Sequence, residues 1–372
     1  MRVAAKRTLL LPTRRYAIRH QPIQRENVMS DMGKITSRNH GKGFSLIEMM
    51  IAMTIGLMVV AALTAVVISS GRSSRANDRT SELQSNGRYA LDVLKRDLQS
   101  AGYYGLSGRG VDQSLINLPQ DCYAGFASNI NQRIWGSNDG VNTFNTSCIP
   151  TANYAGSDIL VIRYTSLNDF PSVASVPPPV DPAGITGFAN TGANTLFFRS
   201  AYETNKLYQA VALPTFTNQP QRDHIVQVHV YYVAPWSVSA AENPQIPSLR
   251  RLVLDNTGAM TDQLVASGIE NMQVQYGILT AGNTQYFDAQ NVNPGVAPAL
   301  DSVTSPVDAT GISVNNWGNV NAVRVWLLSR NAGSERNEAY INNTQYAMGD
   351  VVRQYNDPFR RQLFTSTIQI RN

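Results

Sequence analysis

The chain has 372 residues, of which 43% are hydrophobic and 15% charged, and this balance is that of a folded protein rather than a disordered one. Its formal net charge is +5, but residues 1–43 hold ten Lys or Arg against two acidic residues, which leaves 21 basic and 24 acidic residues, about −3, for the rest. Because the basic excess lies in residues 1–43, the rest of the chain is mildly acidic, and we expect no direct binding to nucleic acid.

An apolar segment spans residues 44–68 and contains one ionisable side chain, Glu48. As a helix, these 25 residues are long enough to cross the hydrocarbon core of a bilayer, so we predict one membrane span. The basic residues before the span favour a cytoplasmic N-terminus, which places everything after Ser70 on the other side of the membrane. No small-residue cleavage site follows the span, so we do not expect an ordinary signal peptide that is removed after it.

The sequence GKGFSLIE at residues 41–48 leads a flexible basic stretch directly into the apolar segment. These residues resemble the cleavage motif of type IV prepilins. The resemblance implies that a membrane-embedded prepilin peptidase cuts between Gly43 and Phe44 and that Phe44, the new N-terminus, is N-methylated. It also implies that Glu48 is the glutamate that this family carries near its new N-terminus.

The carboxylate of Glu48 is out of place in an apolar helix, where a charge of this kind costs about 2.5 to 3.5 kcal/mol on insertion scales. It needs a cation, and the prepilin resemblance implies one: the α-amine of Phe44 on a neighbouring subunit, which would set the axial register of packed helices. The alternative is that Glu48 lies close enough to the helix start to reach the lipid headgroups and to be favoured by the positive helix terminus.

Residues 1–43 are longer than the short leader peptides typical of prepilins. Met29 and Met32 offer later starts, with leaders of 15 and 12 residues that are still basic. We expect translation to begin at one of these rather than at Met1, so that residues 1–28 are an upstream extension that is not translated. The alternative is a targeting role for this extension.

Beyond the apolar segment, helical periodicity continues in amphipathic form. Apolar and small residues recur at three- and four-residue steps at Leu83, Gly87, Ala90, Leu91, Leu94, Leu98 and Ala101. Charged residues lie mostly elsewhere on the helical wheel, at Arg88, Asp92, Lys95, Arg96 and Asp97. This pattern predicts a helix with one apolar face.

Gly102 stands where a glycine is expected just after a helix, so we predict one nearly unbroken helix from Phe44 to Ala101. Such a helix is far longer than a membrane requires, and its second half must pack on something else. The sequence RYALDVLKRDLQSAGYYG at residues 88–105 resembles the corresponding region of large minor pilins, in which that partner is the subunit's own β-sheet. The alternative is a coiled-coil stalk.

Two cysteines occur, Cys122 and Cys148, without the spacing of a zinc site. In an exported protein we expect them to form one disulfide. Two buried free thiols are the alternative.

Beyond Gly105, short apolar runs alternate with connections rich in Gly, Asn, Pro and Ser, which predicts a β-rich head. The candidate strands are Asp158–Tyr164, Thr195–Arg199, His224–Val233, Leu249–Leu254, Met272–Tyr276, Val320–Leu328 and Phe364–Ile370. Alternation in His224–Val233 places Val228, Val230 and Tyr232 on one face, as in a sheet with one buried side. We therefore expect a helix on an antiparallel sheet. Residues 171–184 and 281–311 are expected to be long irregular connections.

The C-terminal half resembles the PilW-like family of minor pilins in several short stretches. They are Tyr231–Val233, Pro247–Arg251, Gly268–Gly277, Val323–Leu328 and Arg360–Phe364. The resemblance spans nearly all of the chain after the leader, and it implies an assembly role rather than catalysis.

No catalytic or metal-binding motif is visible in the sequence, and we expect no enzyme activity, cofactor or metal. In the head, His224 and His229 lie five residues apart on opposite faces of one predicted strand, so we do not expect them to form a site.

We therefore predict an α+β, pilin-like fold: one long N-terminal helix packed on a largely antiparallel β-sheet head. The expected parts are a leader at 1–43, a membrane and fibre-packing half-helix at 44–70, an amphipathic half-helix at 71–102, and a periplasmic or extracellular head at 103–372.

The predicted function is that of a minor pilin in the priming, assembly or capping of type IV pili. Its expected partners are other minor pilins, the major pilin, prepilin peptidase, inner-membrane lipid and the pilus assembly machinery. The chain is expected first in the inner membrane and then in the pilus at the cell surface. The alternatives are a minor pseudopilin of a type II secretion system, an adhesin head whose loops bind a surface, and a membrane-anchored periplasmic enzyme.

Overall fold

The chain divides into two compact units, residues 1–66 and 67–372, and each is described by itself. The computed structural model describes residues 43–106, 116–144, 148–167, 170–171, 194–209, 221–280, 282–293, 316–333 and 340–370. The leader region before Gly43 and most of the two predicted irregular connections lie outside these residues.

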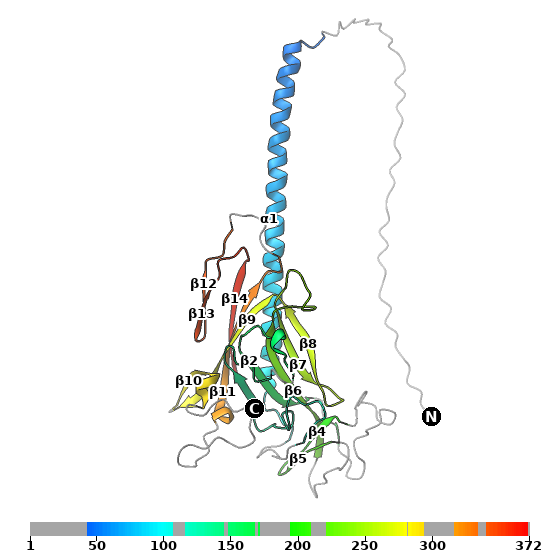
Figure 1. Cartoon of the computed structure of the whole chain (residues 1–372), viewed down its shortest axis with the longest axis vertical. Coiled ribbons are helices and arrows are strands. Elements are labelled where there is room, and N and C mark those ends of the chain that lie inside the picture. Colours follow the sequence, from blue (N-terminus) through cyan, green and yellow to red (C-terminus); the bar gives the residue numbers. More distant parts are fainter. Residues whose placement is uncertain are drawn as a thin grey trace, which may run out of the picture. The chain divides into compact units, whose positions relative to one another are not determined.

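Helix α1 runs over Leu46–Ser100, within two residues of the predicted ends (Figure 1). In the first unit every residue from 46 to 66 is exposed, and apolar side chains lie on all sides of the helix. The hydroxyls of Thr54 and Thr64 donate to helix carbonyl oxygens at Ile51 and Val60, both at 2.8 Å. These two threonines thus satisfy their hydroxyls within the helix, and this half of α1 presents a largely apolar surface.

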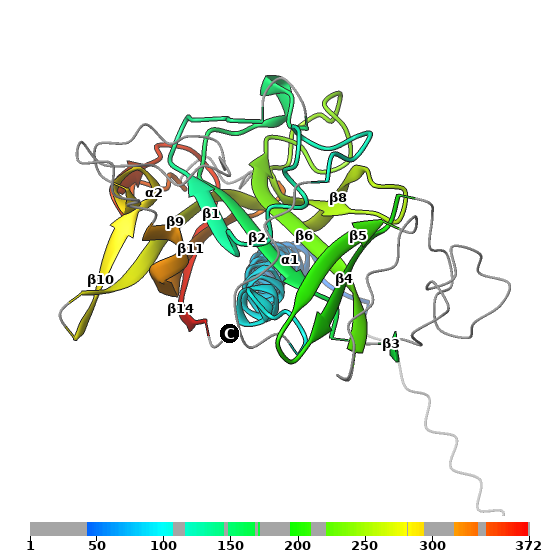
Figure 2. The same cartoon turned by 90° about the horizontal axis from the view of Figure 1, so that it is seen from below.

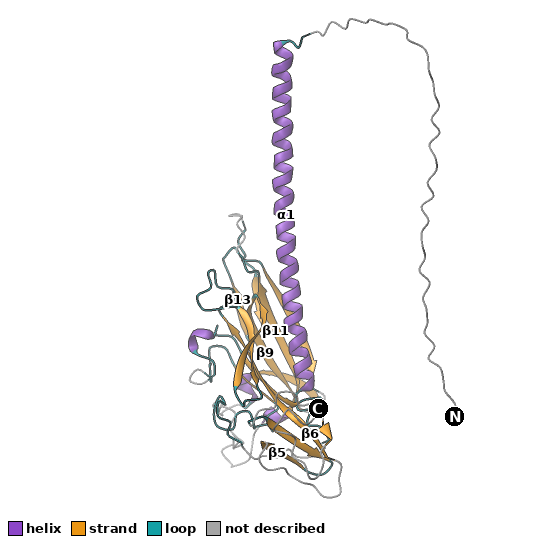
Figure 3. Ribbon diagram, turned by 90° about the vertical axis from the view of Figure 1, so that its right-hand side faces the viewer, coloured by secondary structure: helices purple, strands orange, loops and turns teal. Residues whose placement is uncertain are grey.

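In the second unit, α1 buries one face against the strands (Figure 3). Its buried residues are Leu83, Gly87, Ala90, Leu94, Asp97 and Leu98. The predicted apolar face is therefore confirmed, and the coiled-coil alternative is wrong. The helix ends as predicted: Gly102 has a φ of +75°, and its N–H donates to the carbonyl oxygen of Arg163 at 3.0 Å.

The larger sheet is antiparallel and is organised around β6 (Gln221–Ala234). Along one edge, β6 pairs with β2 (Ile159–Thr165), which in turn pairs with β1 (Ile134–Ser137). The other strands pair with β6 or extend from it, and they are β3 (Phe170–Pro171), β4 (Leu196–Ala201), β5 (Asn205–Gln209), β7 (Ser248–Leu254) and β8 (Met260–Ser267).

A second antiparallel sheet has the order β10-β9-β11-β14. Its strands are β9 (Ile269–Thr280), β10 (Asn283–Asp288), β11 (Val320–Arg330) and β14 (Arg361–Gln369). The remaining elements are the hairpin β12 (Gln345–Met348) and β13 (Val351–Gln354), helix α2 (Ala289–Val292), and the 3₁₀ turns η1 (Thr151–Asn153) and η2 (Asn316–Asn319). Seen from below, α1 has β2 and β6 on one side and β14 close by on another (Figure 2). The predicted α+β architecture is confirmed.

All seven predicted strands are present, but β6 differs from its expected burial. His229 and Tyr231 point to α1, yet Val228, Val230 and Tyr232 on the opposite face are buried as well. That face is covered by the segment around Phe126: Arg163, the register partner of Val228, stacks its guanidinium 4.6 Å from the centre of the Phe126 ring. The expectation of one buried side was therefore wrong for this part of β6.

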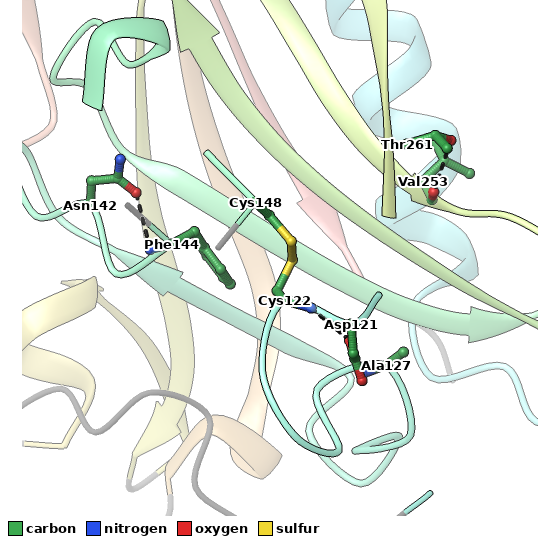
Figure 4. The surroundings of a disulfide bond; sticks show 8 residues. All are labelled: Asp121, Cys122, Ala127, Asn142, Phe144, Cys148, Val253 and Thr261. Atoms are coloured by element: carbon green, nitrogen blue, oxygen red, sulfur yellow. Dashed lines mark hydrogen bonds between the residues drawn. A yellow bond between two sulfur atoms is a disulfide. The ribbon is translucent and has the colours of Figure 1, made fainter. Parts of the chain in front are cut away.

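The predicted disulfide joins Cys122 to Cys148, with their Cα atoms 5.3 Å apart (Figure 4). The bond closes the covering segment, whose Phe126 and Phe144 rings pack edge to face at 5.4 Å. The alternative of two free thiols is wrong. Because 26 positions separate the cysteines, the bond restricts the unfolded chain considerably.

Part of one predicted irregular connection is regular. Residues 283–288 form β10, which pairs with β9 from Asn283↔Thr280 to Asp288↔Gln275, and α2 follows at once. The expectation of an irregular connection from residue 281 was therefore wrong for its first part, because the alternation in Asn283–Asp288 is mostly polar and gave no hydrophobic signal.

Close packing of α1 on β14 depends on Gly87. A Cβ atom added to Gly87 would lie 2.2 Å from a ring carbon of Phe364, whereas one added to Gly71 would meet nothing within 4 Å. We predict that Gly87→Ala lowers the free energy of unfolding of the head by about 1–3 kcal/mol through overpacking. Thermal unfolding of the full chain in detergent, followed by near-UV circular dichroism, measures this.

The matched control is Gly71→Ala, which should raise helix stability by up to about 1 kcal/mol because alanine is the better helix former. The smaller side chain of Phe364→Leu should relieve the cost of Gly87→Ala in the double variant. Equal effects of alanine at the two glycines would contradict this account of the contact.

Candidate functional site

The first described residues, Gly43, Phe44 and Ser45, lead into α1. Phe44 is 84% exposed, and the first helical hydrogen bond here joins the Met49 N–H to the Ser45 carbonyl oxygen at 3.1 Å. The predicted cleavage position therefore lies in non-helical backbone directly before a helix.

Glu48 lies in the first turn of α1 and is exposed. Within the described part of the chain it has no ion-pair partner. A carboxylate in the first helical turn is favoured by the helix dipole, but residues 44–68 contain no other charged side chain. An external cation would therefore be the natural partner of Glu48 in an apolar environment.

The surface around Glu48 is apolar on every side of the helix. Its large side chains include Ile47, Ile51, Ile55 and Met58, each more than half exposed. Residues 46–66 would span about 30 Å as a helix, which matches the hydrocarbon core of a bilayer. This apolar surface is suited to contact with lipid or with other apolar helices.

The second part of the site is a buried polar cluster that joins α1 to the larger sheet through Asp97. One carboxylate oxygen of Asp97, Oδ2, lies 2.5 Å from the Nδ1 of His229 and accepts the hydroxyl of Tyr231. The other, Oδ1, accepts the hydroxyl of Tyr164 at 3.2 Å. The guanidinium of Arg251 stands 3.5 Å from Oδ2, so both carboxylate oxygens are engaged by β2, β6 or β7.

The charge state of Asp97 follows from these contacts. Burial would raise its pKa, but the hydrogen bond and charge interaction with His229, together with Tyr231 and Arg251, outweigh burial and lower the pKa below its ordinary value of 3.8. Burial and the neighbouring carboxylate raise the pKa of Tyr231 well above its ordinary value, so its hydroxyl remains a donor. Asp97 is therefore a buried anion with its partners in place.

Asp97 is a residue that the sequence analysis missed. Its charge placed it among the residues expected off the apolar face, but it is only 9% exposed. A signal was present, because Asp97 follows Leu94 by three residues and so continues the apolar steps. His224 and His229 do lie on opposite faces of β6, and His229 serves to bind Asp97.

The described residues offer no group of three or more His, Cys, Asp or Glu side chains arranged to hold a metal ion. The candidate site has two separate parts: the predicted processing residues at the start of α1, which are exposed, and the Asp97 cluster, which is buried and polar.

Comparisons with known proteins match both ends of the chain. Residues 230–372 match the type IV pilus-assembly protein W family, PilW, and residues 38–64 match the prokaryotic N-terminal methylation motif. Among solved structures, a type IV-like pilin from Thermus thermophilus is similar, with 12% identity, a TM-score of 0.29 and coverage of 80% of this chain and 97% of that chain. No curated protein matches the chain. Gly43, Phe44 and Glu48 lie inside the methylation match, and Tyr231 and Arg251 lie inside the PilW match.

We predict that Asp97→Asn lowers the free energy of unfolding by about 2–4 kcal/mol, because it leaves buried donors without their anion. The folded-state pKa of Asp97 is lowered, so its contribution is present above its unfolded pKa and is lost as the pH falls from about 4 through the folded value. Unfolding of the full chain in detergent between about pH 2 and 7 measures both effects, because this range extends well below the ordinary pKa of an aspartate.

Asp92→Asn is the control, since Asp92 pairs with Arg96 on the exposed surface of the same helix and its side chain is 49% exposed. This change should cost less than about 1 kcal/mol. If Asp97→Asn proved as mild as Asp92→Asn, or left the acid dependence unchanged, the buried cluster would not have the role assigned to it.

Proposed function

We propose that this chain, which is a PilW-like type IV pilin, works as a minor, non-catalytic subunit that takes part in priming, assembling or capping a type IV pilus. The observation that carries the proposal is the first half of α1. It is an exposed, all-round apolar helix that begins just after Gly43 and Phe44 and carries Glu48 in its first turn.

In this proposal the chain occupies two environments in turn, first the inner membrane and then the pilus. The apolar half of α1, residues 44–70, holds the subunit in the inner membrane with the N-terminus in the cytoplasm and the head in the periplasm. The same surface then packs among the helices of other pilins, since lipid and neighbouring apolar helices solvate it alike. The disulfide between Cys122 and Cys148 suits the oxidising compartment in which this places the head.

Processing links the two stages. Prepilin peptidase cuts after Gly43 and the new N-terminus, Phe44, is methylated on its α-amine, which still accepts a proton. In the fibre this cation pairs with the Glu48 carboxylate of a neighbouring subunit. Because an unpaired carboxylate costs about 2.5–3.5 kcal/mol in an apolar environment, the pairing favours one axial register over others.

The head, residues 103–372, selects neighbours among the minor and major pilins and the assembly machinery. The amphipathic half-helix, residues 71–102, belongs to the same packed body through Asp97 and the apolar face around Leu94. Packing surfaces and charge pairs suffice for this role, and no step of it needs a catalytic group.

Mass spectrometry of the N-terminal peptide tests the processing. In membranes of cells that contain prepilin peptidase, we predict a mature N-terminus at N-methylated Phe44, and in cells without the peptidase an uncut leader. Gly43→Val should leave the leader attached, because the peptidase no longer meets a residue without a side chain at the cut. Gly41→Val, two residues earlier in the same basic stretch, is the matched control and should be processed like the wild type.

An uncut N-terminus in the presence of the peptidase would contradict the proposal. Residues 44–68 would then be a permanent membrane anchor, and the head would more plainly have the function of a receptor or a membrane-anchored enzyme.

A further inference from the structure

A polar pocket of about 430 Å³ opens beside β9, β11 and β13. It is lined by, among others, Glu270, Asn271, Arg330, Arg353 and Tyr355. Its volume lies within the range of small-ligand sites, and its side chains supply more hydrogen-bond donors than free acceptors.

The acidic residue of the lining, Glu270, is already occupied. Its Oε2 accepts from the Nε of Arg361 at 2.5 Å, and its Oε1 accepts from the Nη2 of Arg361 at 3.1 Å. Arg330 reaches the same Oε1 only at 3.4 Å. Arg330 therefore has only a long, weak hydrogen bond to Glu270.

Arg330 is otherwise poorly compensated. Its Nη2 donates to the carbonyl oxygen of Gln245 at 2.8 Å and its guanidinium stacks 4.3 Å from the Phe359 ring. Its Nε is buried and has no hydrogen-bond partner among the residues that the structure describes. The side chain is 14% exposed. A buried donor without an acceptor costs free energy, so an anionic acceptor that enters the pocket and accepts this hydrogen bond would be stabilised there. In agreement, burial lowers the pKa of Arg330 more than the nearby Glu270 raises it.

Arg353 and Tyr355 supply further donors at the same pocket. Arg353 contacts Asp139 through Nη2 at 3.0 Å, and its side chain is 48% exposed, which leaves the rest of its fork open to solvent. The ring of Tyr355 lies 3.7 Å from the guanidinium carbon of Arg361. Burial and Glu270 raise the pKa of Tyr355 to about 12, so its hydroxyl stays protonated at neutral pH.

We propose that this pocket binds a carboxylate, with Arg330 and Arg353 as the main donors, and that an acidic side chain of a neighbouring pilin head presents it. The planar fork of arginine matches the two oxygens of a carboxylate. The source of the carboxylate rests on the proposed pilus function, whereas the binding chemistry stands on the pocket itself. The pocket would thus be a contact by which the head chooses a neighbour.

Titration calorimetry of the full chain in detergent tests the site with two probes, glutarate and the blocked peptide acetyl-Gly-Glu-Gly-amide. Both should bind, and Arg353→Gln should weaken both about tenfold. Tyr355→Phe should weaken both by a smaller factor. Arg353 and Tyr355 are preferred to Arg330 as test positions because Arg330 is packed against Phe359 and its loss could disturb the fold.

The charge-matched control is Lys206→Gln, an exposed position on β5, which should bind both probes like the wild type. Absence of binding, or equal binding by the Arg353→Gln chain, overturns the carboxylate site. Binding of glutarate without the peptide overturns the acidic side chain as the source. These binding results do not depend on the mass spectrometry of the N-terminal peptide. Failure of the proposed pilus function can therefore be distinguished from failure of the carboxylate site.

Discussion

The contact of Asp97 with His229 and Tyr231 fixes how residues 67–100 of α1 lie on the head, and the packing of residues 67–372 depends on it. Leu83, Leu94 and Leu98 are buried on the apolar face of the helix, but hydrophobic packing is not directional and tolerates small rotations and shifts. A buried carboxylate does not, because it is costly unless each of its partners is in place. Asp97 therefore specifies the rotation and axial position that the leucines stabilise.

The same helix has to meet a second demand at its other end. Residues 46–66 present apolar side chains on all sides, and Thr54 and Thr64 turn their hydroxyls back to helix carbonyls. Glu48 is the exception, and in the proposed fibre its charge is used in the way that Asp97 is used in the head. Asp97 favours one register of the helix in the head, and in our proposal Glu48 does the same in the fibre.

Much of the fold was predictable because its signals are local. Apolar steps from Leu83 to Leu98 and the glycine at position 102 predicted the packed half of α1 and its end, and runs of β-branched residues predicted β2, β6 and β11. The strands that were missed, such as β8 and β13, carry mostly polar or exposed residues at an edge, where hydrophobic alternation is weak. The burial of both faces of β6 depends on a distant segment around Phe126, which no local pattern reveals.

The candidate site also has a part with a local sequence signal and a part that depends on distant contacts. Gly43, Phe44 and Glu48 form a contiguous motif and were predicted from the sequence. Asp97 and His229 are 132 positions apart, and Glu270 and Arg361 are 91 apart, so their meeting is a consequence of topology. A charged residue at an apolar step of a helix, as at Asp97, is the one local sign that such a partner exists.

The most direct test of the central claim, that this chain is a pilus subunit whose Glu48 sets its register, is quantitative mass spectrometry of head peptides in sheared pili. The account predicts the wild-type head in the pilus fraction, and at least about tenfold less of the Glu48→Gln head at equal membrane levels. If no head peptide accompanied the pili of the wild type, or if Glu48→Gln entered them equally well, the account would be contradicted.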